Sequence, residues 1–375
     1  MTIKIFIAEP SINESDIKSV NDAVRSGWIS GRGPFIDKFE KEFARWNGTK
    51  YGITTTSGTS ALHLALASLG VSQNDEVIIP ALSMSAVSFS VSYVGGKAIL
   101  VDSETDTWNI DVNAVEKKIT NKTKAIIAPH LYGHPIEIDI LLDIAKKYNL
   151  PVVEDAAEAH GAEYKKRKVG SFGRIACYSF YANKIMTCGE GGIIVTNDQE
   201  LAEKVSKLKN MAFENNPASK FLHYSLGYNY RLTNMQAALG LSQLLRIEKF
   251  IEARRNNAKL YNRLLENLDG ISLPPESEWA KNVYWMYSII IDKKRFGISR
   301  DELLKGLIEK YGIETRPFFV TVNQQPIYKQ IYRGERYPVA EQLSKEGLNL
   351  PSGNTLTENQ ITSVVAAIKS LKNSS

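Results

Sequence analysis

The sequence contains very little cysteine for its length. Only Cys177 and Cys188 occur in 375 residues, and one pair cannot build the disulfide framework on which many small secreted proteins depend. Long apolar runs are missing as well. The N-terminal stretch MTIKIFIAEP is too short in apolar residues for a signal peptide, and no stretch approaches the ~20 residues that cross a bilayer. We therefore expect a cytoplasmic protein without a membrane partner.

A strong charge of one sign is also absent. Lysine and arginine total 46 against 41 aspartates and glutamates, which gives a formal net charge of +5. No basic block alternates with aromatic residues, so the sequence argues against a nucleic-acid partner. Hydrophobic residues make up 43% and charged residues 23%, which is ordinary for globular proteins and excludes a wholly disordered chain. The length predicts two domains.

Short apolar segments alternate with helical patterns through the first 200 residues. Strand-like segments occur at 77–79, 125–128 and 151–153, and a helical pattern at 138–148 lies between two of them. Strands that are apolar throughout are typical of a parallel or mixed sheet covered on both faces. The sequence therefore predicts an α/β fold with a mixed, mostly parallel sheet between helices.

The pattern changes in the second half of the chain. Residues 232–268 carry long helical periodicity, and a strand-like segment at 283–291 precedes a proline-rich turn region from Pro317. We expect a large cofactor-binding domain over residues 1–245 and a smaller C-terminal α+β domain over residues 246–375.

The segment 56–60, with the sequence TSGTS, lies between a predicted strand and an apolar helix. Gly58 allows close approach of a ligand to the backbone, Thr59 offers a hydroxyl, and the helix start offers free N–H groups. Together they are suited to a phosphate. The alternative is an ordinary strand-to-helix turn with a capping residue.

Two further motifs supply an acid and an amine. Asp155 follows a predicted strand near the centre of the sheet, where an unpaired charge is costly, so it needs a cationic partner; the alternative is a helix-capping carboxylate. Lys184 lies between a buried strand and the glycine-rich turn at 189–192. Its aromatic and small neighbours favour a lowered pKa and a nucleophilic amine, whereas a surface lysine is the usual alternative.

A phosphate site, a buried carboxylate and a reactive lysine on one sheet are the groups that pyridoxal 5'-phosphate (PLP) requires. The donor-rich segment 227–234 fits no helix or strand period, and its simplest interpretation is a polar loop. The residues alone thus predict a PLP enzyme.

The chain resembles the DegT/DnrJ/StrS family of sugar aminotransferases, which are fold-type I PLP enzymes, over nearly its full length. The resemblance is carried by eight motifs: WISGRG at 28–33, SGTSALH at 57–63, PHLYG at 129–133, EDAAEAHG at 154–161, SFYANK at 179–184, GEGG at 189–192, GYNYRLTN at 227–234 and the tripeptide at 315–317.

The resemblance implies a role for each matching residue. Lys184 matches the Schiff-base lysine that also moves the proton, and Asp155 matches the partner of the pyridine nitrogen. Glu158 lies where relatives contact the phenolic oxygen of the cofactor. Asn229 matches a phosphate ligand donated by the second subunit of a homodimer. The remaining implied cofactor contacts are Gly58, Thr59, Met84 and Ser179.

The implied reaction moves an amino group from glutamate to a keto sugar, most simply a nucleotide-linked 4-keto-6-deoxyhexose destined for a surface polysaccharide such as lipopolysaccharide. No metal is implied. Asn183 and Glu158 match one branch of the family in particular. The implied substrate contacts are Trp28, Ser30, His130, Arg231, Arg316 and Asn323.

The sequence departs from the family at two places. Met84 stands where relatives have an aromatic residue over the cofactor. Residues 320–323, Val-Thr-Val-Asn, replace a His-Pro-x-His run that lines the sugar site. The second departure leaves a different small or phosphorylated ketone open as the acceptor. Two other functions are alternatives. One is a sugar dehydratase on the same fold, which has histidine in place of Lys184; the other is a regulator that binds PLP without turnover, which does not need that lysine. The presence of Lys184 argues against both.

Overall fold

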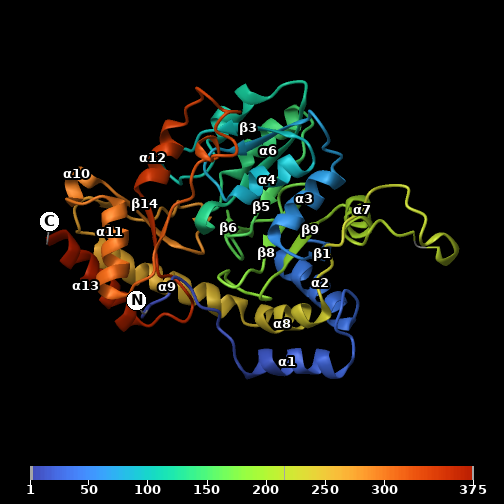
Figure 1. Ribbon diagram of the computed structural model, residues 1–375, viewed down its shortest axis with the longest axis horizontal. Helices are drawn as coiled ribbons and strands as arrows, with labels where there is room; N and C mark the ends of the chain where they lie inside the picture. The colour runs from blue at the N-terminus through green and yellow to red at the C-terminus, as the bar shows by residue number, and fades with distance from the viewer. Residues whose placement is uncertain (1–2, 215, 374–375) are drawn as a thin grey trace.

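The computed structural model describes residues 3–214 and 216–373. A large body surrounds a central sheet, and a smaller body at the left contains the last third of the chain (Figure 1). Both chain ends lie beside the C-terminal helices in this view. Near the N-terminus, Ile5 forms a parallel β-bridge with Ile313, so the N-terminal segment packs against the smaller body.

The central sheet has seven strands among the described residues, in the order β1-β9-β8-β5-β4-β2-β3. The strands from β8 to β3 are parallel to their neighbours, and β9 is antiparallel to both β1 and β8. This confirms the mixed, mostly parallel sheet. The bounds are Tyr51–Thr55 (β1), Glu76–Pro80 (β2), Lys97–Val101 (β3), Thr123–Pro129 (β4), Val152–Asp155 (β5), Ile175–Ser179 (β8) and Gly192–Thr196 (β9).

The apolar strands are covered on both faces. In β2, Val77 and Ile79 belong to one buried cluster, whereas Ile78 between them belongs to another. Side chains of a strand alternate between the faces of a sheet, so a continuously apolar strand needs a helix layer on each side. Leu62 of α3 (Gly58–Ser68) lies in the first cluster and Leu141 of α6 (Ile138–Lys147) in the second.

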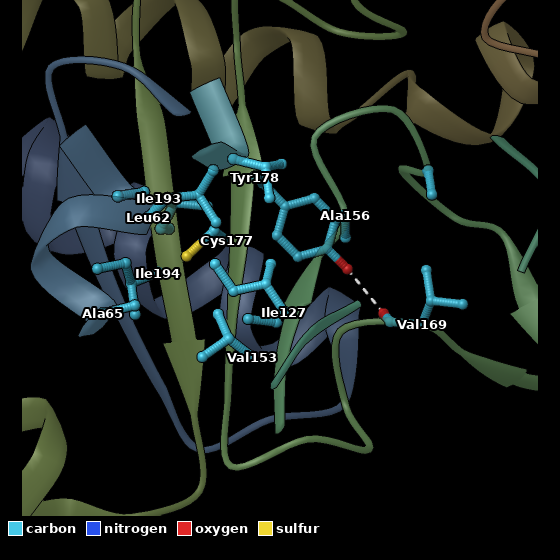
Figure 2. Packing of buried hydrophobic residues seen from close by; sticks show 14 of the residues in the cluster. Leu62, Ala65, Ile127, Val153, Ala156, Val169, Cys177, Tyr178, Ile193 and Ile194 are labelled. Atoms are coloured by element: carbon cyan, nitrogen blue, oxygen red, sulfur yellow. Dashed lines mark hydrogen bonds between the residues drawn. The ribbon is translucent and has the colours of Figure 1, made fainter. Parts of the chain in front are cut away.

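Figure 2 shows the first of these clusters from close by. Leu62 and Ala65 of α3 lie against the sheet near Ile193 and Ile194, and Cys177 lies among them. The hydroxyl of Tyr178 donates a hydrogen bond to the carbonyl of Val169 at 2.7 Å. A buried hydroxyl is thus satisfied inside an otherwise apolar layer.

Several helices of the large body begin at capping residues. Asn13 caps α1 and Ser57 caps α3, each through a capping box. The helices are α1 (Glu14–Arg25), α2 (Pro34–Asn47), α3 (Gly58–Ser68), α4 (Ser85–Tyr93), α5 (Val112–Val115), α6 (Ile138–Lys147), α7 (Gln199–Lys209) and α8 (Asn234–Leu244), with short turns η1 (Glu116–Lys118), η2 (Leu131–Gly133) and η3 (Pro217–Ser219).

The smaller body has its own sheet, in the order β10-β12-β14-β13, and its own core, which includes Tyr261, Ile289 and Ile368. Its elements are α9 (Ile247–Leu265), β10 (Ile271–Ser272), β12 (Tyr287–Ile291), α10 (Lys293–Phe296), α11 (Arg300–Gly306), η4 (Leu307–Tyr311), β13 (Arg316–Pro317), η5 (Val322–Gln324), α12 (Pro338–Glu346), β14 (Gly347–Leu350) and α13 (Glu358–Asn373). A third, three-stranded sheet joins the bodies through β6 (Glu163–Tyr164), β7 (Arg167–Lys168) and β11 (Ala280–Lys281).

Helix α9 contributes side chains to both cores. Phe250 and Ile251 pack into the large cluster, and Tyr261 and Leu265 pack into the C-terminal one. The predicted boundary at residue 245 falls just before this helix, and we propose the same division into residues 1–245 and 246–375.

Both cysteines are buried and form no disulfide in the described part of the chain. Within residues 3–214 and 216–373, no helix combines the length and the apolar character that crossing a membrane requires.

Candidate active site

Three neighbouring strands end together at one edge of the central sheet. Pro129 of β4 lies opposite Asp155 of β5, and Asp155 lies opposite Cys177 of β8. Ser179 is the last residue of β8, two residues beyond Cys177. Because parallel strands share the direction in which they end, the motifs at 154–158 and 179–184 come together at the edge where α/β proteins bind ligands.

Helix α3 starts at the same edge. A Cβ atom at Gly58 would lie 2.8 Å from Cβ of Ser179, so only glycine permits this approach of helix and strand. The capping box pairs Ser57 with Ser60, while the N–H groups of Gly58 and Thr59 have no carbonyl of their own helix to bind. These donors, the positive end of the helix dipole and the hydroxyl of Ser179 form a site for an anion.

Asp155 is a buried carboxylate with one strong contact. It is 7% exposed, and its Oδ1 accepts a hydrogen bond from the N–H of Ala157 at 3.1 Å. Burial raises the pKa of Asp155, against the opposing effects of that N–H and of the positive charge of Lys184. A cation placed beside the carboxylate keeps it ionised, and a protonated pyridine nitrogen is such a cation.

Lys184 lies in the turn between β8 and β9. Its Nζ is 4.0 Å from Oε1 of Glu158 and 3.7 Å from the ring centroid of Trp285. Burial lowers the pKa of Lys184, although the negative charges of Glu158 and Asp155 oppose this shift. A lowered pKa increases the share of neutral amine, the form that attacks a carbonyl.

Glu158 lies beside the amine and is itself buried. Its Oε2 accepts a hydrogen bond from the N–H of Tyr132 at 2.8 Å. Burial raises the pKa of Glu158 to about 7, with the charge of Lys184 opposing. Near neutral pH this carboxyl can therefore either donate or accept a hydrogen bond at a phenolic oxygen.

These residues fit PLP at several independent points. The N-terminus of α3 offers anion donors where a side chain at Gly58 would collide with Ser179. Asp155 is a buried acid that lacks a hydrogen-bonded cation in the described part of the chain, and Lys184 is a buried amine at the same edge. This donor set matches the phosphate, the ring nitrogen and the aldehyde of the cofactor.

The other two predicted cofactor contacts lie on exposed segments. Met84 directly precedes α4 and is 50% exposed, so its thioether is available to pack on a ring. Asn229 is exposed and forms an isolated antiparallel bridge with Asn210. Their roles stay predictions.

Three of the predicted substrate residues lie together. Trp28 and Ser30 are exposed, and Asn234 holds both through their carbonyls, at 2.8 Å in each case. Arg231 packs so closely on Gly31 that a Cβ atom there would lie 2.8 Å from Cβ of Arg231. The structure thus brings the WISGRG and GYNYRLTN motifs side by side.

His130 lies below the site rather than on its surface. It is 1% exposed, its Nδ1 accepts a hydrogen bond from the N–H of Ile136 at 3.2 Å, and its Nε2 lies 3.2 Å from Oε2 of Glu154. With both ring nitrogens engaged, the ring in this structure supports the end of β4, and it has no free nitrogen for a substrate.

The last two predicted substrate residues belong to the smaller body. Arg316 is exposed, and its positive charge contributes to the lowered pKa of Lys184, which places it within electrostatic reach of the site. Asn323 is buried and donates through Nδ2 to Oε1 of Glu341 at 3.0 Å. The amide is therefore held by α12, and a sugar contact from Asn323 stays a prediction.

Sequence reasoning did not single out two aromatic residues beside Lys184. Trp285 comes from the segment before β12, and Tyr132 stacks on it with ring centroids 6.3 Å apart. The only local signal for Tyr132 is the HLYG motif, where it adopts φ +52° directly before Gly133. No sequence pattern marked Trp285 as a site residue, because it lies within a segment that the sequence predicts to be a strand.

Comparison with known proteins gives a consistent result. The model of the DegT/DnrJ/EryC1/StrS aminotransferase family matches residues 10–369. The GDP-perosamine synthase of Escherichia coli O157:H7 is 41% identical over 362 residues, which cover 96% of this chain and 97% of that protein.

Solved structures agree over the same length. DesV of S. venezuelae has 34% sequence identity and a TM-score of 0.89, covering 95% of this chain and 94% of its own. Helicobacter pylori PseC, an aminotransferase involved in the biosynthesis of pseudoaminic acid, has 27% identity and a TM-score of 0.93, covering 99% and 100%. The fold is thus shared with these two solved structures over nearly the full length of each chain.

Proposed function

The chain belongs to the DegT/DnrJ/EryC1/StrS aminotransferase family, and from that membership we propose that it transfers the amino group of glutamate to a nucleotide-linked 4-keto-6-deoxy sugar. The protein is a PLP-dependent sugar aminotransferase. The observation that carries the proposed roles is the position of Lys184 Nζ, 4.0 Å from Glu158 at the edge where Asp155 ends β5.

Each residue of the site has a defined task in this proposal. When bound, PLP supplies the electron sink for the reaction. The start of α3 and Ser179 hold the phosphate, and Asp155 keeps the proton on the ring nitrogen. Glu158 orients the phenolic oxygen. Lys184 Nζ accepts a proton from one carbon and returns it to another, which a buried amine with a lowered pKa is suited to do.

The proposed acceptor rests on two residues and one relative. Asn183 and Glu158 match the GDP-perosamine synthase branch, and the relative from E. coli with 41% identity carries that name. We propose that the product enters a surface polysaccharide such as lipopolysaccharide and that the enzyme works in the cytoplasm. The segment 320–323 argues for a changed sugar preference, since Val320 is exposed and Asn323 is held by Glu341.

We expect activity with a 4-keto-6-deoxyhexose nucleotide, but with a preference that differs from that of GDP-perosamine synthases. Two imidazoles of relatives are replaced here, and a hydroxyl left without a partner costs roughly 1–3 kcal/mol. The measurement is kcat/KM for GDP-4-keto-6-deoxymannose, for UDP- and dTDP-linked 4-keto sugars and for small keto phosphates, each with the protein in its pyridoxamine form.

Two outcomes would change the assignment of the acceptor. A value near ~10⁴ M⁻¹s⁻¹ for the GDP sugar alone would show that the segment 320–323 matters little. Reaction with a small ketone and with no nucleotide sugar would leave only the transaminase chemistry. A dehydratase is disfavoured because Lys184 is present, and a regulator without turnover would show no change of visible absorbance on addition of glutamate.

We further propose that the site is completed by a second copy of the chain. The segment 216–228, which contains η3 and precedes α8, extends from the body at the right of Figure 1 and exposes Phe221 and Tyr224 at 76% each and Leu226 at 87%. Such an apolar surface is typical of an interface. Asn229 follows it directly, and we propose that it contributes to a partner's phosphate site.

This arrangement predicts recovery of activity in mixed dimers. When Lys184→Ala and Asn229→Ala subunits are refolded together, one site of each mixed dimer combines an intact Lys184 with an intact Asn229. We expect about a quarter of the wild-type activity, since half of the dimers are mixed and half of their sites are intact. The matched control pairs Lys184→Ala with Asp155→Asn, which leaves no intact site. Equal activity in both mixtures would place Asn229 in its own subunit's site.

A further inference from the structure

The amine group of Lys184 lies over the face of an aromatic ring from the second half of the chain. Nζ of Lys184 lies 3.7 Å from the ring centroid of Trp285. The indole is 6% exposed and belongs to the large buried cluster. A cation at this distance over an indole is attracted by the negative face of the ring, and the attraction is stronger where water is excluded.

The indole is also tied to the backbone next to the lysine. Its Nε1–H donates a hydrogen bond to the carbonyl of Asn183 at 3.0 Å. One side chain therefore contacts both the amine of Lys184 and the peptide group that leads into it. This double contact fixes the start and the end of a flexible four-carbon chain.

Trp285 is itself held on two further sides. Tyr132 stacks on the indole at an interplanar angle of 20°, and the backbone N–H of Tyr132 donates to Glu158. At the backbone of Trp285, the buried guanidinium of Arg254 donates to the carbonyl of Trp285 at 2.6 Å and to that of Ser352 at 3.0 Å. Arg254 forms no ion pair with a carboxylate among the described residues, and two of its three hydrogen bonds go to backbone carbonyls while the third goes to Oδ1 of Asn354.

We propose that Trp285 is a positioning residue for Lys184: whenever the amine is not bonded to the cofactor, the indole face holds it beside Glu158. This inference rests on the proposed function, in which Lys184 Nζ must release the cofactor, collect a proton and return it. A lysine without such a hold would sample several rotamers between these steps, and proton transfer needs the amine within hydrogen-bond reach of the reacting carbon.

The charged and titratable groups around the amine do not replace this contact. Glu158 and Asp155 favour the ammonium form, whereas Arg254 and Arg316 disfavour it, and the neutral ring of His160 interacts only weakly from below, since burial lowers the pKa of His160 to about 3. The Glu158 carboxylate is 4.0 Å from Nζ, and all of these charges come from residues other than Trp285. The contribution of Trp285 can therefore be separated by changing the ring and leaving the charges in place.

The test measures the protonation midpoint of Lys184 by competitive acetylation. The full chain is freed of bound cofactor and loaded directly with pyridoxamine 5'-phosphate, labelled with acetic anhydride from pH 6 to pH 11, and the modified Lys184 peptide is quantified by mass spectrometry. Trp285→Leu keeps the surroundings apolar but removes the aromatic face, so we expect the midpoint to fall by about one pH unit. Trp285→Phe keeps a face and loses only the Nε1–H bond, so a smaller fall is expected.

The matched control is Trp279→Phe, because Trp279 packs on Tyr164 and His134 and not on Lys184. The midpoint of Lys184 in this variant should equal that in the wild type. Trp285→Leu should also lower kcat with little change in KM. A folded, cofactor-binding Trp285→Leu protein with an unchanged midpoint would overturn the inference, and so would an equal fall in Trp279→Phe. The midpoint is read without turnover. If the wild-type protein transferred no amino group and Trp285→Leu still lowered the midpoint, only the proposed function would be refuted.

Discussion

Replacement of Lys184 by alanine is expected to abolish amino transfer, with a loss of at least about 10⁴-fold in rate. Alanine offers no amine to bind the cofactor and none to move the proton, and the nearest other polar group, Glu158, is a carboxyl whose pKa burial raises to about 7. The side chain of Lys184 is only 11% exposed, so water does not readily take its place.

Two measurements check this expectation. Steady-state transamination gives the rate, and borohydride reduction followed by mass spectrometry of the denatured protein reports a covalent adduct, expected at Lys184 in the wild type and absent in the variant. Lys165→Ala is the control, since this exposed lysine pairs with Asp139 outside the site. Near-normal transamination by Lys184→Ala, or an adduct on another lysine, would remove the assigned role.

Replacement of Asp155 by asparagine is expected to lower the rate by about 10³-fold, which corresponds to a barrier increase of about 4 kcal/mol. The amide keeps the size of the side chain, and its oxygen can still accept the N–H of Ala157. What is lost is the negative charge that holds the proton of the ring nitrogen. Because that charge is buried, no solvent compensates for its removal.

The comparison that isolates the charge uses Asp139→Asn, a similar change at an exposed carboxylate on α6. Rates of the glutamate half-reaction are measured for both variants together with thermal unfolding, so that a folding defect is not mistaken for a catalytic one. A folded Asp155→Asn protein within a few-fold of the wild-type rate would show that Asp155 is only structural.

The strand pattern of the large body was predictable from the sequence alone. Residues 77–79 are apolar and β-branched at successive positions and are followed by Pro80, which is typical of a strand in a sheet buried on both faces. The structure divides them as expected, with Ile78 on one face and its two neighbours on the other. The start of α3 was equally local, because Ser57 caps a helix by bonds to residues within its first turn.

Strand β12 shows where local reasoning failed. Residues 283–291 read as one strand, but the structure begins it at Tyr287. The N–H of Val283 donates instead to Gly133, and the carbonyl of Trp285 accepts from Arg254. Partners 150 and 31 residues away thus take backbone groups that a strand would use, and no local pattern reveals them.

The sequence by itself determined the chemistry of this protein: a phosphate-binding helix start, Asp155 and Lys184 are carried by short motifs whose residue types have few other uses together. Only the tertiary structure decided which side chains surround them. It buried His130 beneath the site and brought Trp285 over the amine of Lys184. The physical reason is that motif chemistry depends on groups within one turn or one strand end, whereas the contact between Trp285 and Lys184 joins residues about 100 positions apart, which only packing in the large buried cluster brings together.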